Sequence, residues 1–416
     1  ILSVLEKPER RQQVWQVSLV MASNERWLLP DGIDELLPER AASVEALRRA
    51  LLDDCAHWGY RYVIPPLVEF TDSLLVGLGA DLDVLTCKFS DRTSGRMLGV
   101  RADITPQVAR IDAHALGEVG VTRLCYTGST LHSAPQSTSA GRSPIQLGAE
   151  LYGCADISAD LEVIDLMLAL MARADTEERH GPVTLDVGNV GVYQAVLRHS
   201  GIEDDAANTI FDALQRKSLP DLDEAVITID VETASVLRAL VNLHGGPEVL
   251  DQARACLANV PEALAALDEV EQVIAFVRSV HPSVSVYVDL AELRGFQYHT
   301  GLVFAAYLEG VGTAVAMGGR YDNVGAVFGR SRPATGFAFD LKALMATAKP
   351  AVANDKPVSA PDLRDAELLQ VVRNLRAAGR SVITALGGVH DTRCGELLVK
   401  GDDGWVMQPL NPGENQ

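Results

Sequence analysis

Four short segments of the sequence combine charged, hydroxyl, amide and aromatic side chains closely enough to hold a small polar ligand. Residues 101–107 are predicted to end a strand and begin a helix, where Asp103 and Thr105 could meet a ligand beside free backbone N–H groups. On the next predicted strand, Gln146 and Glu150 share one face across a glycine, because side chains alternate with a period of two. A simple capping segment and an exposed polar sheet face are the alternative interpretations.

The other two segments lie in the second half of the chain. Residues 293–301 place a cation, two aromatic rings and two glycines within nine positions. Arg294 could form a forked pair of hydrogen bonds with a carboxylate, while Tyr298 or His299 could contact a polar ring; a turn is the alternative. Residues 318–323 read Gly-Gly-Arg-Tyr-Asp-Asn, and their glycines indicate close packing or positive φ. Their Arg and Asp could also simply pair with each other.

The elements that must position these segments are of mixed type. Apolar residues at helical spacing predict helices over 40–58, 105–115 and 158–179. Apolar runs bounded by turn signals predict strands at 60–64, 123–126, 144–152, 284–290 and 302–308. Hairpins are prominent, so we expect an α+β fold with a largely antiparallel sheet flanked by helices.

The chain also divides into regions of different pattern. Residues 191–281 are helical almost throughout and interrupt two sets of strands, which predicts a helical insertion in a core at 21–348. Three prolines make 349–363 a predicted linker, and 364–416 are predicted to form a small α/β unit. Residues 1–20 precede the first methionine, and we expect a non-native or disordered extension there.

Composition excludes several classes of function. The 416 residues suggest two or three domains at about 150 residues each. With 36 Lys and Arg against 56 Asp and Glu, the net charge of -20 argues against binding to nucleic acid or anionic membrane. No apolar run reaches the roughly 18 residues of a spanning helix, and the start lacks a secretory apolar core. Six dispersed cysteines without a CxxC pair favour reduced thiols. We expect a cytoplasmic protein without metal or cofactor.

Taken in order, the motifs resemble the class II aminoacyl-tRNA synthetases, specifically the catalytic domain of histidyl-tRNA synthetase, over residues 27–344. Residues 101–105 are similar to that family's Arg-Pro-Glu-Gly-Thr stretch and 146–150 to its Gln-x-Gly-x-Glu strand. Residues 294–299 are similar to its Arg-Gly-Leu-Asp-Tyr-Tyr stretch, and 318–322 match its Gly-Gly-Arg-Tyr-Asp. Residues 60–66 resemble the first motif, which forms the dimer.

The resemblance implies a pocket for histidine. The implied residues, grouped by the part of histidine that each would meet, are Asp103, Thr105 and Gln146 for the ammonium group, Arg294 for the carboxylate, and Glu150, Tyr298 and His299 for the imidazole ring. The family has a tyrosine at the last of these positions. A Leu-Asp pair in the family is replaced here by Phe296 and Gln297.

Two departures from the synthetase pattern change the expected function. The phosphate-binding arginine of the second motif falls at His132 or Ser133, and the final arginine of the third motif falls at Ala343. Loss of preorganised charge at a phosphoryl centre typically costs orders of magnitude in rate. The unit after the linker is also shorter than the family's anticodon-binding domain. We therefore expect no tRNA charging and no catalytic residues.

A histidine pocket without the ATP-binding cations resembles the ATP phosphoribosyltransferase regulatory subunits, a family that residues 293–307 and 318–341 match closely. The resemblance implies a non-catalytic subunit that binds the short-form catalytic subunit, activates it in the first step of histidine biosynthesis and relays histidine feedback. It also implies a hetero-oligomer with a homodimeric core formed around residues 60–69. The alternatives are a degenerate histidyl-tRNA synthetase and a synthetase-like histidine sensor with another partner.

Overall fold

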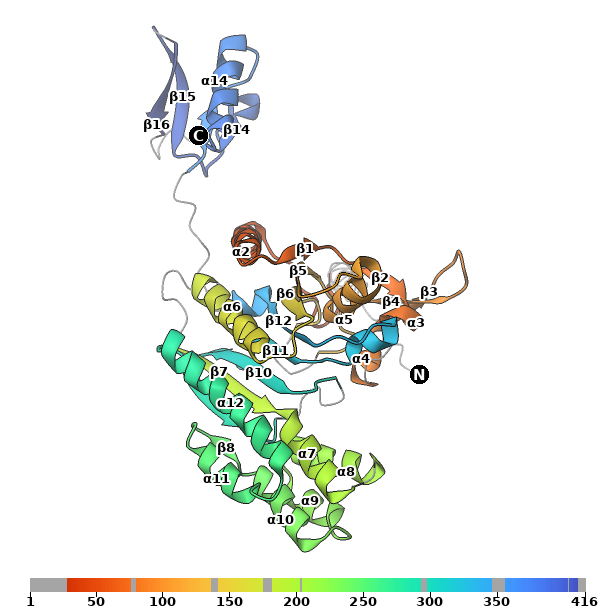
Figure 1. Ribbon diagram of the computed structural model, residues 1–416. Coiled ribbons are helices and arrows are strands. Elements are labelled where there is room, and N and C mark those ends of the chain that lie inside the picture. The colour runs from red at the N-terminus through yellow and green to blue at the C-terminus, as the bar shows by residue number, and fades with distance from the viewer. Residues whose placement is uncertain are drawn as a thin grey trace, which may run out of the picture. The chain divides into compact units, whose positions relative to one another are not determined.

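The computed structural model describes residues 28–75, 80–135, 141–174, 182–202, 204–292, 298–345, 356–402 and 404–410. The chain forms two compact units, Ile1–Lys349 and Pro350–Gln416, which we call the core unit and the C-terminal unit (Figure 1). No helix among the described residues combines the length and the apolar character needed to cross a bilayer.

A nine-stranded sheet forms the centre of the core unit, in the order β1-β5-β6-β12-β11-β10-β7-β9-β8. Its strands are β1 (Arg61–Val63), β5 (Thr122–Ser129), β6 (Ile145–Tyr152), β7 (Val183–Asn189), β8 (His244–Gly245), β9 (Ser285–Asp289), β10 (Leu302–Leu308), β11 (Ala316–Arg320) and β12 (Ala334–Asp340). The pairs β1–β5 and β7–β9 are parallel and the other neighbouring pairs are antiparallel. The sheet is therefore largely antiparallel, as predicted.

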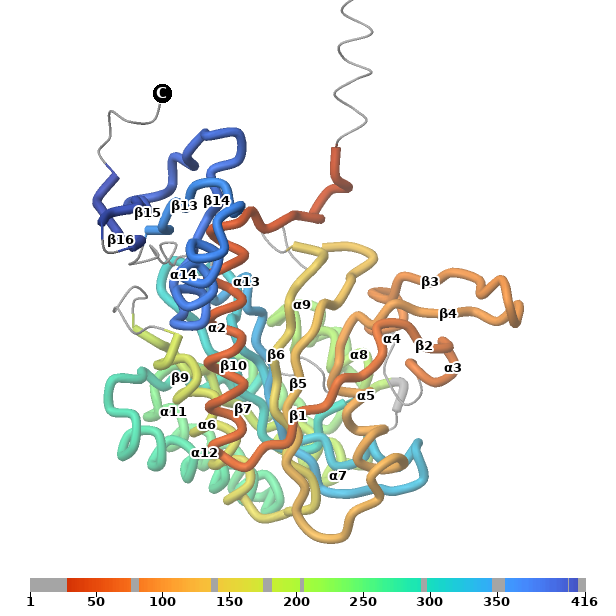
Figure 2. The backbone as a smooth tube through the Cα atoms, turned by 90° about the horizontal axis from the view of Figure 1, so that it is seen from above, coloured from red at the N-terminus to blue at the C-terminus, as the bar shows by residue number. Residues whose placement is uncertain are grey.

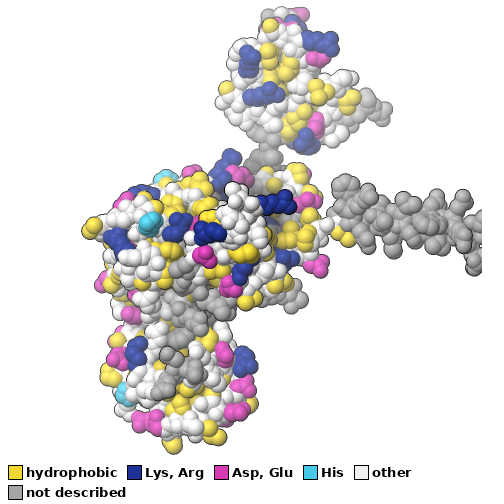
Figure 3. Space-filling model, turned by 90° about the vertical axis from the view of Figure 1, so that its right-hand side faces the viewer, with side chains coloured by type: hydrophobic (Ala, Val, Ile, Leu, Met, Phe, Trp, Pro, Cys, Tyr) yellow, Lys and Arg dark blue, Asp and Glu magenta, His cyan; other side chains and the backbone are white. Residues whose placement is uncertain are grey.

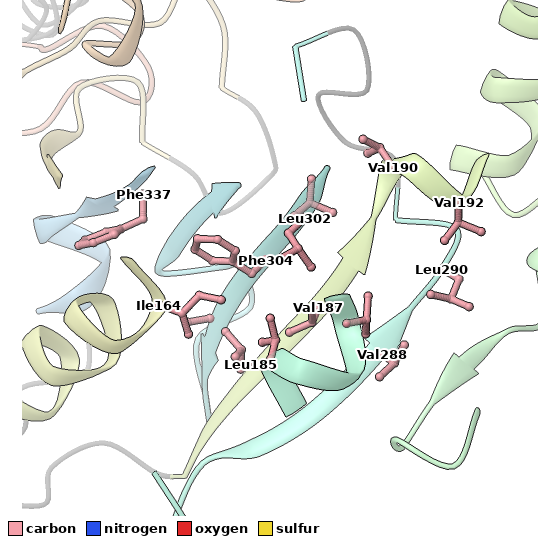
Figure 4. Close-up of a cluster of buried hydrophobic side chains, with 14 of the residues drawn as sticks. Ile164, Leu185, Val187, Val190, Val192, Val288, Leu290, Leu302, Phe304 and Phe337 are labelled. Atoms are coloured by element: carbon pink, nitrogen blue, oxygen red, sulfur yellow. The ribbon is translucent and has the colours of Figure 1, made fainter. Parts of the chain in front are cut away.

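Three helices pack in a row against one face of this sheet: α2 (Pro38–His57), α6 (Ser158–Ala174) and α12 (Pro261–Val280). The alternating residues Leu147, Ala149 and Leu151 of β6 belong to the apolar core on this side. Figure 4 shows how Ile164 of α6 lies near side chains of the neighbouring strands, among them Phe304. Burial of such side chains from water is the main force that holds helices on the sheet.

A run of helices lies between β7 and β9. It comprises α7 (Val190–Ser200), α8 (Asp204–Gln215), α9 (Leu219–Ala225), α10 (Val231–Leu240), α11 (Val249–Cys256) and α12. Asn189 and Asp230 cap α7 and α10 by accepting hydrogen bonds from backbone N–H groups. The stretch predicted to be helical at 191–281 also contains the short strand β8, which pairs with β9.

A smaller antiparallel sheet has the order β2-β4-β3, and its β3–β4 hairpin projects from the core unit (Figures 1 and 2). The elements in this region and after it are β2 (Val68–Phe70), α3 (Thr71–Leu74), α4 (Ala80–Leu85), β3 (Cys87–Ser90), β4 (Met97–Val100), α5 (Thr105–Arg110) and the π-helical turn η1 (Ile111–Leu116). Two short helices, η2 (Val324–Phe328) and α13 (Leu341–Leu344), flank β12 in the chain.

The start of α5 is not capped by the threonine that lies there. Threonine is a common N-cap residue, but Ile104 occupies the N-cap position of α5, and the Ile104 side chain makes no capping hydrogen bond. The Thr105 hydroxyl instead lies 2.8 Å from the hydroxyl of Tyr126 on β5. The hydroxyl is free to turn inward because the first N–H groups of the helix have other partners: that of Ile104 donates to Gln146 and that of Thr105 to Asp103.

The C-terminal unit has its own four-stranded sheet, in the order β14-β13-β15-β16. Its elements are β13 (Val358–Ala360), α14 (Ala366–Ala377), β14 (Val382–Thr384), η3 (Leu386–Gly388), β15 (Glu396–Gly401) and β16 (Gly404–Pro409). The strand β13 lies inside the predicted linker 349–363, so that expectation is corrected. The sequence of β13 resembles a linker because it is short and flanked by prolines. In the structure this strand is buried between two parallel strands, β14 and β15.

Candidate functional site

The centre of the candidate site is Glu150, in the middle of the sheet. Glu150 is only 1% exposed and accepts hydrogen bonds from the hydroxyls of Tyr126, at 3.0 Å, and Tyr321. Gly336 of the neighbouring strand β12 lies opposite Glu150, and a Cβ atom at Gly336 would come within 1.5 Å of a Glu150 carboxyl oxygen. Glycine at that position is what allows the carboxyl group to lie flat against the neighbouring strand.

Burial changes the protonation of this carboxyl group. Desolvation raises the pKa of Glu150 to about 8, against the opposing effect of hydrogen bonds from Tyr321, Thr105 and Tyr126. The negative charge of Asp103 raises that pKa further. Glu150 is therefore protonated at neutral pH when no ligand is present.

Asp103 and Gln146 join the first two sequence segments. The amide nitrogen of Gln146 donates to Asp103 Oδ1 at 2.7 Å, and its amide oxygen accepts the backbone N–H of Ile104 at 2.9 Å. The backbone N–H of Thr105 donates to the same Asp103 oxygen at 3.1 Å. The turn before α5 is therefore held against β6, and acceptor groups gather beside the helix start.

Tyr126 connects this turn to Glu150. Its hydroxyl lies 2.8 Å from the Thr105 hydroxyl and 3.0 Å from a Glu150 carboxyl oxygen. It has room because Gly148 lies opposite it on β6, where a Cβ atom would come within 2.3 Å of the tyrosine oxygen. The glycine of the Gln-x-Gly-x-Glu strand thus makes space for a buried protein side chain.

Aromatic rings cover the other side of Glu150. The ring of Tyr298 stacks on that of Tyr321 with 5.0 Å between centroids, and His299 meets Tyr298 edge-on at 5.3 Å. Nδ1 of His299 lies 3.2 Å from the carbonyl oxygen of Arg320. Desolvation lowers the pKa of His299 to about 4, so its imidazole ring is neutral at physiological pH.

Arg320 positions Tyr321 through a buried ion pair. Its guanidinium group donates to Asp160 of α6 at 2.5 Å and to the carbonyl oxygen of Cys154 at 3.2 Å. A longer contact of 3.3 Å joins it to Asp322, so the pairing considered from sequence exists but is secondary. The end of β11 is therefore fixed to the start of α6.

Most of the predicted site residues come together in one network. It contains Asp103, Thr105, Gln146, Glu150, Tyr298 and His299. Arg294 lies outside the described residues, as do the neighbouring Phe296 and Gln297.

Sequence reasoning missed three tyrosines of this network. Tyr126 and Tyr321 donate to Glu150, and the ring of Tyr152 meets that of Tyr321 edge-on at 6.4 Å. Two signals were available: Tyr152 lies two residues after Glu150 on the same strand face, and Tyr321 belongs to the Gly-Gly-Arg-Tyr-Asp motif.

The two positions where the synthetase pattern predicts arginine make local contacts. Nε2 of the buried His132 lies 3.1 Å from the carbonyl oxygen of Ala102, and the backbone N–H of His132 donates to the carbonyl oxygen of Arg142 at 2.8 Å. Ala343 lies on α13, which Asp340 caps by accepting the N–H of Lys342 at 2.9 Å. The histidine ring thus contacts the main chain of the turn that carries Asp103.

One group of acidic side chains has the ligand types of a cation site. Carboxyl oxygens of Asp186, Asp289 and Glu292 lie within 4.8 Å of one another. Asp289 already accepts a hydrogen bond from the Lys217 ammonium group at 2.6 Å, which supplies positive charge there. The group lies at the β7–β9 pair and contains none of the residues of the Glu150 network.

Similarity to known proteins agrees with this geometry. Residues 32–344 match the family model of histidyl-tRNA synthetase. The crystal structure of an ATP phosphoribosyltransferase regulatory subunit/histidyl-tRNA synthetase from Bacillus halodurans is 27% identical, with a TM-score of 0.76 over 88% of this chain and 94% of that chain. The core unit therefore has the fold of the class II synthetase-like proteins, which confirms the predicted fold class.

Further matches identify the family within that class. Residues 355–408 match the ATP phosphoribosyltransferase subunit HisZ C-terminal domain. The ATP phosphoribosyltransferase regulatory subunit of Azotobacter vinelandii is 48% identical over 399 residues, which cover 94% of this chain and 100% of that protein. The chain belongs to the family of ATP phosphoribosyltransferase regulatory subunits. In the ATP phosphoribosyl transferase (HisG:HisZ) complex from Thermotoga maritima, a chain 20% identical shares the fold, with a TM-score of 0.55 over 72% of this chain and 97% of that one.

Proposed function

We propose that this protein is a non-catalytic subunit that binds the short-form catalytic subunit of ATP phosphoribosyltransferase, activates it and transmits histidine feedback. The family supports the partnership, as does the likeness to a chain from a complex of that name. The observation that carries the feedback role is the Glu150 network, in which hydrogen-bonding groups for an amino acid are assembled and buried. This function places the protein in the cytoplasm with its partner.

The proposed pocket has a complementary group for each part of zwitterionic histidine. Asp103 and Gln146, together with the Thr105 hydroxyl, offer acceptors for the ammonium group. The imidazole ring would lie between Glu150 and the Tyr298–His299 pair. Arg294, outside the described residues, is proposed for the carboxylate because its fork of N–H donors matches two oxygens.

We propose further that the protein does not activate histidine with ATP. Ala343 carries no charge, and Nε2 of His132 is engaged with a main-chain carbonyl. Neither position therefore supplies a preorganised cation that could stabilise the charge on a reacting α-phosphate. Histidine-dependent exchange of pyrophosphate into ATP should stay at background, and exchange well above background would favour a degenerate synthetase instead.

A homodimer formed through residues 60–69 is proposed from the exposure of that segment. β1 is an edge strand of the large sheet, and the apolar side chain of Ile64 just after it is 77% exposed. A groove of about 360 Å³ follows, lined by Pro66, Val68, Glu69, Phe70, Ser73, Leu98 and Arg110. Figure 3 views the core unit from the side that carries β3 and β4, and hydrophobic side chains there lie among charged ones. Exposed apolar groups beside an unpaired strand edge are typical of a protein interface.

The function is tested by assaying the short catalytic subunit with and without this protein, and with added histidine. We expect faster phosphoribosyl transfer in the complex and inhibition by histidine that depends on this chain. For a useful allosteric signal the coupling free energy should be about 1–3 kcal/mol, equal to a 5–150-fold change in affinity. Unchanged activity together with no co-purification would contradict the proposal.

A further inference from the structure

Three described carboxyl groups of the core unit are no more than 2% exposed, and arginine neutralises two of them. Asp160 lies 2.5 Å from a guanidinium nitrogen of Arg320, and Asp112 lies 2.8 Å from one of Arg332. Glu150 is equally buried but accepts hydrogen bonds from tyrosine hydroxyls. Among the described residues, no Lys, Arg or His side chain pairs with it.

The groups around Glu150 supply no unpaired positive charge. The titratable side chains that face it or its surrounding rings are Asp103 from the turn before α5, Tyr126 from β5, Tyr152 from β6, Tyr298 and His299 from before β10, and Tyr321 from after β11. Three more charged groups act on these rings: Glu292 on His299, and Asp112 and Arg332 on Tyr152. Arg332 is already paired with Asp112 at 2.8 Å. Burial raises the pKa of each of these tyrosines, so all stay uncharged at neutral pH. The lowered pKa of His299, about 4, keeps that ring neutral as well.

An isolated buried carboxylate is costly unless a cation or a proton neutralises it. Tyr126 and Tyr321 already offer two hydroxyl donors to its oxygens, an arrangement that suits an ionised acceptor. The site is thus built for a carboxylate whose balancing positive charge has to come from elsewhere. A ligand with a weakly basic ring can supply that charge by accepting the carboxyl proton.

We propose that Glu150 and the bound imidazole ring share one proton, so that histidine is held as an imidazolium paired with the Glu150 carboxylate. This inference rests on the proposed histidine site. In the step, the O–H bond of the Glu150 carboxyl group breaks, an N–H bond forms on the ring nitrogen, and no proton enters or leaves the site. Tyr126 and Tyr321 then donate to the resulting carboxylate.

The shared proton makes binding depend on pH in both directions. Free imidazole has a pKa of about 6.5, and that of Glu150 is about 8. Below the lower value both partners arrive protonated, so binding releases one proton and weakens as the pH falls. Above the higher value neither is protonated, so binding takes up one proton and weakens as the pH rises. Affinity should change up to about tenfold per pH unit outside this window.

The protons can be counted by isothermal titration calorimetry of histidine into the complex with the catalytic subunit. Titrations at pH values of about 5.5, 7.2 and 8.8 lie below, inside and above the window, and each is run in two buffers of different ionisation enthalpy. Glu150→Gln removes the titrating carboxyl group with little change in shape. Glu162→Gln is the matched control, because Glu162 pairs with Arg123 at 2.6 Å, outside the network.

At the highest pH we expect wild type and Glu162→Gln each to take up about one proton more per histidine than Glu150→Gln does. Subtracting the Glu150→Gln value removes the contribution of the ligand's own ammonium group. Should Glu150→Gln fail to fold, Tyr126→Phe removes one donor to the carboxylate and should move the upper limb to higher pH. An equal proton count in wild type and Glu150→Gln, or no uptake by wild type, would overturn the shared proton and leave the histidine site intact. Absence of histidine binding at every pH would overturn the site itself.

Discussion

The two faces of the core sheet bury polar groups in opposite ways. Towards α2, α6 and α12, β6 presents Leu147, Ala149 and Leu151 to an apolar core, and the deeply buried Asp160 on that side is paired with arginine. Towards α5, the same strand presents Gln146 and Glu150, whose partners are neutral or acidic. The first face is arranged for stability, whereas the second keeps hydrogen-bonding capacity and a carboxyl group without a cation, which are features of the ligand site that we propose there.

The largest expected effect is on the helix-covered face. Arg320→Met should lower the free energy of unfolding by about 3–5 kcal/mol, because it leaves the Asp160 carboxylate buried without its partner. Urea denaturation of the full chain measures this change. Arg238→Ala breaks the exposed ion pair with Asp223 and serves as the control, where we expect little effect. A similar loss in both variants would mean that the buried pair is not special.

The face that carries Gln146 and Glu150, where we propose that histidine binds, should respond in regulation. Glu150→Ala and Arg294→Ala should each abolish histidine inhibition of the complex while activation of the catalytic subunit is largely kept. The lost coupling corresponds to about 1–3 kcal/mol, a 5–150-fold shift in the inhibitory histidine concentration. Inhibition curves of the complex with each variant measure it. If both variants remain fully sensitive to histidine, the effector binds elsewhere.

Close approach of strands at the site predicts an intolerance to added volume. Gly336→Ala places a Cβ atom against the Glu150 carboxyl group and should destabilise the fold by about 1–3 kcal/mol while weakening histidine binding. Gly312→Ala is the matched control, because nothing lies within 4 Å of a Cβ atom there. Thermal unfolding and histidine titration measure the stability and the histidine affinity of both variants. Equal values for the two variants would argue against the tight fit at Gly336.

Over a single pH unit, the smallest expected change is the change in stability with pH. The pKa of Glu150 in the folded protein, about 8, exceeds its unfolded value, so the folded state binds more protons between roughly pH 4.3 and 8. Stability without ligand should therefore fall as the pH rises through this range, by at most about 1.4 kcal/mol per unit. Glu150→Gln should remove this slope. Parallel curves of unfolding free energy against pH for both proteins would show that Glu150 does not titrate as inferred.

Much of the framework could be predicted because it depends on local pattern. Strand periodicity placed Gln146 and Glu150 on one face, and both lie in the observed network. The strand at 302–308 was predicted with the observed bounds, since a long apolar run has a strong signal. The short strand β13 was missed because three residues between prolines carry too little pattern to be distinguished from a linker.

The sequence by itself determined the order of the motifs, the mixed fold and most of the candidate pocket, since these follow from residue types at short spacing. Tertiary structure alone decided that Tyr126 and Tyr321 converge on Glu150 and that Arg320 finds Asp160, a partner 160 residues away. It also decided the protonation of Glu150. Burial depends on how distant segments pack, and it is the removal of water from that one carboxyl group that raises its pKa to about 8.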